Sequence, residues 1–279
     1  MKKVVSFSLW GDSLHYVLGA ILNADIAKKD WPEWICRFYV SPNVPLEAID
    51  ELSKRDNVEI VKMDKDESWN GMFWRFFAAS DPDVNIAIFR DTDSRLNIRD
   101  KTAVDEWLES DKDVHIIRDM CQHGWVICGG AWGVRGDVLK NIKHEIDDFA
   151  KIKNQPRFNK HGIDQIFLQY EVYQNLIDRI YVHDEWFPDQ FPHEDKHSMP
   201  IPRLRGEGWW HKEIPEWHCG FEFEKGDGHW FRDETCKNPE CCLPCPGCGE
   251  YHDNEFIGKQ VYVNEDNIKK YEHLRKVLK

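Results

Sequence analysis

Two aspartates separated by one residue stand at the end of an apolar run. The run Ile86-Ala-Ile-Phe reads as a buried strand, and Asp91-Thr-Asp93 follows it after one arginine. Side chains two residues apart in an extended segment point the same way, so both carboxylates can approach one cation. Hard cations such as Mg²⁺ and Mn²⁺ take oxygen ligands, usually one or two carboxylates and the phosphates of a substrate. The pair therefore predicts a metal site that clamps a diphosphate; a chance pair in an acidic chain, or a loop cap, is the alternative.

Two further segments carry residue types suited to a ligand site. Gly129-Gly130-Ala-Trp132-Gly133 contains three glycines around an aromatic, and glycines let a backbone approach a ligand closely or form tight turns. Asp164-Gln165 opens an apolar helix, where a carboxylate is also a favoured helix cap. Arg75 is a candidate for a diphosphate, because a guanidinium matches phosphate oxygens.

Taken in order, these elements resemble the GT-A superfamily of glycosyltransferases over roughly residues 4–220. Asp91-Thr-Asp93 looks like the Asp-x-Asp signature, and the glycine segment is similar to the small-residue strand that lies against the donor sugar. Asp164-Gln165 resembles the Asp-Gln pair of the retaining, glycogenin-like families, which contacts the donor sugar near its reacting carbon. His218 stands where those families place a third metal ligand; a surface histidine or a ligand of the nearby cysteines is the alternative. Gly129-Gly130 departs from the commoner Asn-Ala, which leaves the stereochemical outcome open.

The resemblance implies a metal-dependent transferase that moves a hexosyl or pentosyl group from a nucleotide sugar, with UDP expected, to a glycan or other hydroxyl acceptor. It implies Mn²⁺ or Mg²⁺ on Asp91, Asp93 and His218, with Asp164 and Gln165 in catalysis. The expected donor-binding residues are Ser8, Leu9, Tyr16, Arg75, Arg118, Asp119, Gly129 and Gly130. The pocket for the base should lie beyond the first predicted strand, near the first three of these residues. Surface ion pairs are the alternative for the two arginines and Asp119.

Two other classes of function remain. Phosphatases of the haloacid-dehalogenase class also place Asp-x-Asp after a strand and use the first aspartate as nucleophile. Their motif usually follows the first strand and has Thr or Val at its fifth position, whereas here it follows the fourth strand and Arg95 stands there. A zinc-stabilised binding protein that has lost catalysis is the second alternative. Intact Asp91, Asp93 and Asp164 favour an enzyme.

An alternation of strands and helices must position these residues. It predicts a mostly parallel central sheet with helices on both faces, a Rossmann-like α/β fold of the GT-A kind. Ligands collect beyond the carboxyl ends of such strands. Expected strands are residues 4–9, 36–40, 58–63, 85–90 and 114–117, and expected helices are 16–27, 46–54, 73–79, 103–109 and 268–278. Residues 1–220 are expected to form the catalytic domain, and residues 221–279 a cysteine-rich extension, with loops and short strands over 186–235.

Five of the nine cysteines lie within residues 236–248. The Cys245-Pro-Gly-Cys248-Gly turn is typical of a knuckle that presents two thiolates to one metal. With Cys236 and either Cys241 or Cys242 it can close a tetrahedral zinc site of structural role, and His252 is a possible substitute ligand. One or two disulfides, or free thiols, are the alternatives.

The formal net charge of −13 over 279 residues argues against a general nucleic-acid binder, because phosphate must be met by Lys and Arg. The sequence contains no run of 18 apolar residues, so no membrane anchor is predicted. The scattered placement of the other cysteines does not resemble a secreted disulfide framework and favours a cytoplasmic setting. Of the 13 tryptophans, those in apolar settings should lie in the core. For those in polar loops, core packing and stacking on a sugar are both open. The first set is Trp31, Trp34, Trp74 and Trp107, and the second is Trp209, Trp210, Trp217 and Trp230.

Overall fold

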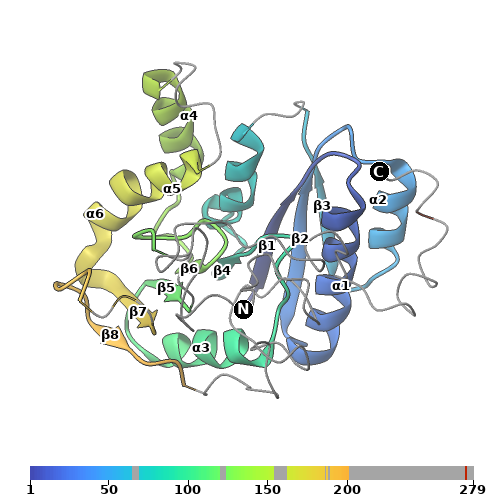
Figure 1. The fold of residues 1–279 in the computed structure, drawn as a ribbon. Coiled ribbons are helices and arrows are strands. Elements are labelled where there is room, and N and C mark those ends of the chain that lie inside the picture. The colour runs from blue at the N-terminus through green and yellow to red at the C-terminus, as the bar shows by residue number, and fades with distance from the viewer. Residues whose placement is uncertain are drawn as a thin grey trace, which may run out of the picture.

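The computed structural model describes residues 1–64, 69–119, 124–153, 162–185, 187, 189–200 and 274. Its centre is one eight-stranded sheet, with helices packed against it (Figure 1). The strands are β1 (Lys3–Leu9), β2 (Trp34–Val40), β3 (Val58–Lys62), β4 (Ile86–Phe89), β5 (Val114–Arg118), β6 (Trp132–Arg135), β7 (Ile180–Asp184) and β8 (Lys196–His197). The helices are α1 (Leu14–Asp30), α2 (Leu46–Ser53), η1 (Trp69–Ser80), α3 (Ile98–Glu109), α4 (Ile142–Lys153), α5 (Ile163–Phe167), η4 (Leu168–Tyr173), α6 (Gln174–Leu176) and η5 (Ile177–Arg179).

The strand order is β3-β2-β1-β4-β6-β5-β7-β8, and every neighbouring pair is parallel except the two pairs that involve β6. A mostly parallel α/β sheet is therefore confirmed. The reversed direction of β6 has a geometric consequence. Phe89 pairs with Trp132, so the residues that precede β6 lie beside those that follow β4. At the other end, the Gly136 amide, after β6, donates to the Asn85 carbonyl, before β4, at 2.6 Å.

Two apolar clusters lie on opposite faces of the sheet. Along β1, alternate side chains divide between them: Phe7 belongs to the cluster with α1 and α2, and Val4 to the cluster with η1, α4 and α5. This division follows the two-residue period of a strand. Helices on both faces are thus confirmed, as Figure 1 shows. The four tryptophans expected in the core, Trp31, Trp34, Trp74 and Trp107, are all buried.

The sequence missed some elements and misjudged others. The stretch expected as a helix over 73–79 is a longer 3₁₀ helix, η1, and α4 and β7 were not predicted. β8 is a short strand in the loop-rich region expected after residue 185. The domain boundary at 220, the cysteine cluster and the second set of tryptophans lie outside the described residues. Within the described residues, no helix is long and apolar enough to cross a membrane.

Candidate active site

Arg75 joins two of the predicted site carboxylates. Its Nη1 pairs with Asp91 Oδ1, and its Nη2 donates to Asp164 Oδ2 at 2.8 Å. Arg75 and Asp164 are buried, whereas the Asp91 side chain is 43% exposed. The sequence separates these residues by up to 89 positions, and the fold brings them to one place beyond the carboxyl end of β4.

β1 fixes the backbone of Arg75. The Ser6 hydroxyl donates to the Arg75 carbonyl at 2.6 Å, and the Arg75 amide donates to the Ser8 hydroxyl at 3.0 Å. Both serines are buried on one face of β1, two residues apart. Ser8, predicted to lie near a nucleotide base, thus also holds the arginine. No local sequence pattern predicts this contact, because η1 follows β1 by more than fifty residues.

Gly129 and Gly130 make room for the two carboxylates. A Cβ built on Gly129 would overlap Asp164 Oδ2 and lie 2.6 Å from Arg75 Nη2, and one on Gly130 would overlap Asp91 Oδ2. Any side chain at either position would have to displace a carboxylate. The two glycines therefore let the backbone approach Asp91 and Asp164 closely, and the predicted close approach to a donor sugar stays a prediction.

Asp164 is not a helix cap. α5 begins at Ile163, and its N-cap is Gly162, whose φ of 83° is the left-handed conformation that glycine adopts readily. Asp164 therefore lies in the first turn and turns its carboxylate to Arg75. Burial, reinforced by the charge of Asp91, raises the pKa of Asp164, although Arg75 opposes the shift. In turn, Asp91 and Asp164 raise the pKa of Arg75 against the opposing effect of burial, so the guanidinium stays charged.

Several buried polar atoms in this cluster have no hydrogen-bond partner in the described part of the chain. They are Arg75 Nε, Asp164 Oδ1 and Gln165 Oε1. Buried polar groups in folded proteins are nearly always satisfied by protein or by water, so such atoms call for an explanation. A polar ligand that enters beside Asp91 would supply both donors and acceptors to them.

Asp93 lies apart from the arginine. Its carboxylate is 3.6 Å from His15 Nε2 on α1 and its side chain is 29% exposed. Burial opposes ionisation of this group, but His15 and Arg95 outweigh it and lower the pKa of Asp93. The two carboxylates of the Asp-x-Asp pair are thus held by different elements, Asp91 by η1 and Asp93 by α1.

The two carboxylates fit a hard cation in part. Both reach solvent on one loop, and a cation of this kind is commonly held by one or two carboxylates with substrate phosphates and water completing the shell. Among the described residues, however, no group of three or more His, Cys, Asp or Glu side chains could hold a metal. The predicted third ligand, His218, and the predicted zinc ligands Cys236, Cys241, Cys245 and Cys248 lie outside the described residues.

Arg118 and Asp119 are engaged in buried ion pairs. Arg118 pairs with Asp184 at 3.0 Å and with Glu194 at 2.7 Å, and its Nη2 donates to the Val126 carbonyl at 2.6 Å. The Asp119 carboxylate accepts two bonds from Arg99, at 2.7 and 2.6 Å. Both residues therefore form ion pairs, but these pairs are buried, whereas the alternative expected them on the surface. Donor contacts for both residues stay predictions.

The other two residues expected near the base differ in exposure. Leu9 is buried in the core cluster with α1, so its side chain is committed to packing. Tyr16 is 43% exposed and packs edge-on against His15.

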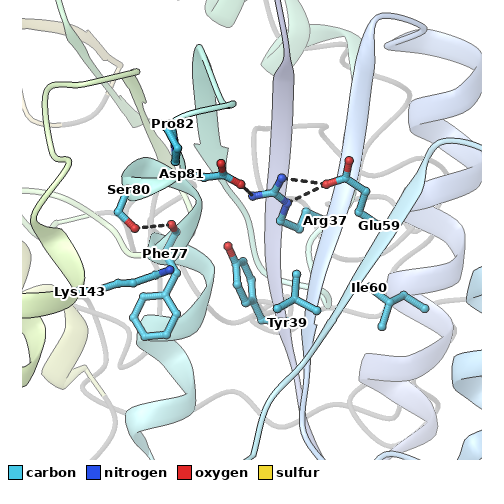
Figure 2. Close-up of a pocket in the computed structure, with 10 residues that line it drawn as sticks. Arg37, Tyr39, Glu59, Ile60, Phe77, Ser80, Asp81, Pro82 and Lys143 are labelled. Carbon is cyan, nitrogen blue, oxygen red and sulfur yellow. Dashed lines mark hydrogen bonds and ion pairs between the residues drawn. The ribbon is translucent and has the colours of Figure 1, made fainter.

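A cavity of about 570 Å³ lies elsewhere, over β2 and β3. Figure 2 shows Arg37 between Asp81 and Glu59 at this cavity, with ion-pair distances of 2.7 and 2.8 Å. Tyr39 and Phe77 also line it. None of the predicted site residues lines this cavity, so it is separate from the Arg75 cluster.

The sequence matches no family model and no curated protein. Among solved structures, the chain is similar to a glycosyltransferase involved in glycosylation of the major capsid of PBCV-1, with 14% identity and a TM-score of 0.44 over 66% of this chain and 82% of that one. It is similar to the galactosyltransferase LgtC, with 12% identity and a TM-score of 0.43 over 65% of this chain and 73% of that one. It is also similar to a 4-diphosphocytidyl-2C-methyl-D-erythritol synthase from Anaerococcus prevotii, with 10% identity and a TM-score of 0.42 over 66% and 88%.

The first two of these structures belong to the class that the sequence motifs predict, and the third is a synthase. With TM-scores below 0.5 in each case, the assignment of function rests on the residues of the site.

Proposed function

We propose that the chain is a glycosyltransferase that takes a sugar from a nucleoside diphosphate, with Mn²⁺ or Mg²⁺ bound at Asp91 and Asp93. One observation carries the proposal: buried Asp164 is linked through Arg75 to the solvent-exposed Asp91. This arrangement places the buried carboxylate of Asp164 and the guanidinium of Arg75 beside the partly exposed loop that carries Asp91 and Asp93.

Each element has a distinct task in this proposal. A cation on Asp91 and Asp93 would neutralise charge on the diphosphate leaving group. Arg75 lies next to Asp91, and its buried Nε has no partner among the described residues, so it can add a bond to a phosphate or sugar oxygen. Asp164 and Gln165 present buried oxygens that would face the sugar. Because positive character develops at the anomeric carbon, a carboxylate held there stabilises the transition state.

The first test is metal-dependent binding of UDP by calorimetry. We expect UDP to bind with Mn²⁺ present, and binding to be lost in EDTA or in Asp93→Ala. Asp111→Ala is the matched control, because Asp111 is an exposed carboxylate far along the chain from the loop, and it should bind as the wild type does. Undiminished UDP binding in EDTA would refute the cation clamp.

Several finer features of the proposal rest on the sequence. The transferred group would be a hexosyl or pentosyl unit, and the acceptor a glycan or other hydroxyl compound. We also propose one structural zinc held by Cys236, Cys241 or Cys242, Cys245 and Cys248. Elemental analysis should find about one zinc per chain, and a mass map showing these cysteines in disulfides would contradict it.

A further inference from the structure

One face of α1 contacts the Asp-x-Asp loop at three successive turns. His15, Gly19 and Asn23 are spaced four residues apart, which places them on one side of a helix. His15 meets Asp93, Gly19 meets Thr92, and Asn23 meets the backbone of Thr92, Ser94 and Leu96.

Asn23 makes the most extensive of these contacts. Its side chain is fully buried. The amide Nδ2 donates to the Ser94 carbonyl at 2.7 Å and to the Thr92 carbonyl at 3.3 Å, and Oδ1 accepts from the Leu96 amide at 3.0 Å. One side chain thus satisfies three backbone groups of a loop about seventy residues away, and both ends of the amide are used. Such pairing matters because a buried backbone group without a partner is unfavourable.

Gly19 brings the loop against the helix. A Cβ on Gly19 would overlap the Thr92 carbonyl oxygen, so the loop can lie this close only because the helix has no side chain there. Arg95 Nη1 donates to the same carbonyl at 3.2 Å. Thr92, the residue between the two aspartates, is itself buried. The centre of the motif is therefore fixed in the protein, while its two carboxylates are partly exposed.

We propose that Asn23 is a positioning residue for the cation site. It acts through the backbone of Thr92 and Ser94, on either side of Asp93, and so sets where Asp93 stands relative to Asp91, which Arg75 holds from the opposite side. This inference rests on the proposed function. The face of α1 that carries Asn23 then determines the affinity for the cation, although Asn23 itself touches neither metal nor substrate.

Two asparagines on the two sides of α1 offer a matched test. Asn57 is also buried, and its Nδ2 donates to the Ala24 carbonyl of α1 at 2.8 Å, but it lies at the start of β3, away from the loop. Asn23→Asp and Asn57→Asp each replace one amide donor by a carboxylate oxygen that faces helix or loop carbonyls. Asn23→Asp removes a buried donor of two hydrogen bonds and Asn57→Asp a buried donor of one, so both should lower the melting temperature.

The readout is the Mn²⁺ concentration that gives half-maximal UDP binding. We expect Asn23→Asp to raise it about tenfold or more, which corresponds to about 1.4 kcal/mol, and Asn57→Asp to leave it within about twofold. Gly19→Ala is a second variant. Alanine favours the helix, but its Cβ would overlap the Thr92 carbonyl oxygen and displace the loop from α1, so this variant should raise the Mn²⁺ requirement too.

The outcomes separate the two proposals. Absence of Mn²⁺-dependent UDP binding in the wild type would overturn the proposed function and this inference with it. Wild-type Mn²⁺ requirement in Asn23→Asp and Gly19→Ala would overturn positioning while the proposed function stands. An equal rise of the Mn²⁺ requirement in Asn57→Asp would show that the fold as a whole is loosened, and would also overturn the positioning role of Asn23.

Discussion

The molecule contains two kinds of buried arginine at the carboxyl edge of its sheet. Arg90 and Arg118 use all three guanidinium nitrogens within the protein: Arg90 on Asp100 and the carbonyls of Phe89 and Trp132, Arg118 on its two carboxylates and the carbonyls of residues 125 and 126. Arg75 is buried as deeply, yet its Nε has no partner among the described residues, and neither does Asp164 Oδ1.

The carboxylates differ as well. Those that pair with Arg90 and Arg118 are at most 1% exposed, whereas Asp91 is 43% exposed. Buried ions are tolerated only where every charged group has its hydrogen-bonding partners. The fully paired arginines and carboxylates therefore have a structural role. The Arg75 cluster is incomplete inside and open to solvent at one end. Saturation of the partners, and not burial alone, distinguishes Arg75 from Arg90 and Arg118.

The comparison predicts its largest effect on stability at Asp100. Asp100→Asn should lower the free energy of unfolding by about 3–5 kcal/mol, because it leaves Arg90 buried without a counter-charge. Urea denaturation measures the loss. UDP binding with Mn²⁺ by the folded protein should change little. A loss of stability below about 1 kcal/mol would mean that the closed pairs are not what holds this edge of the sheet.

Asp164→Asn should affect function instead. We expect the rate of sugar transfer to fall by at least about 100-fold, equivalent to about 2.7 kcal/mol in the barrier, while UDP binding persists. Stability should fall less than in Asp100→Asn, because Asp91 still pairs with Arg75 and burial already disfavours the charge on Asp164. The measurements are turnover and urea denaturation of both variants. Transfer at the normal rate would remove Asp164 from the mechanism.

A buried histidine pair gives the smallest effect. His115 Nε2 and His183 Nδ1 lie 2.8 Å apart between β5 and β7. Burial lowers the pKa of His183 to about 4, and burial with the nearby His183 lowers the pKa of His115. A base with a lowered pKa in the folded state takes up its proton on unfolding, so stability is lost as pH falls below the unfolded value near 6.5.

Between pH 7 and 5.5 the free energy of unfolding should therefore decrease by about 1 kcal/mol for each such histidine. Urea titrations at several pH values measure the slope. His183→Asn should reduce it, whereas the control His144→Asn, at an exposed position on α4, should leave it unchanged. If the free energy of unfolding has the same pH slope in His183→Asn as in His144→Asn, other groups cause the pH dependence.

The sequence predicted those parts of the molecule whose signal is local. The strands before Asp91 and the position of Asp91 and Asp93 at a strand end follow from apolar runs and the residues that stop them. β7 (Ile180–Asp184) was missed although it matches β5 in length and in its mixture of apolar and titratable residues. The contacts that define the site could not be predicted from local patterns, because Arg75 contacts Asp164 across 89 positions of the sequence and Asn23 contacts Leu96 across 73. Nothing in a local pattern distinguishes Arg75 from Arg118.

The reversed direction of β6 has a consequence for engineering. Had β6 run parallel to β4, the residues after it would border Asp91; as built, the bordering residues are those before it, with Gly130 against Asp91 and Gly129 against Asp164. A mutant library meant to alter what this site accepts belongs in residues 124–126 of the same segment, where Trp125 is 42% exposed, leaving the buried Ile127 and Cys128 and the two glycines fixed. Arg118 binds the carbonyls of Trp125 and Val126, and the buried side chains of Ile127 and Cys128 fix the chain after them. Substitutions there would vary the rim of the site on a scaffold secured on both sides.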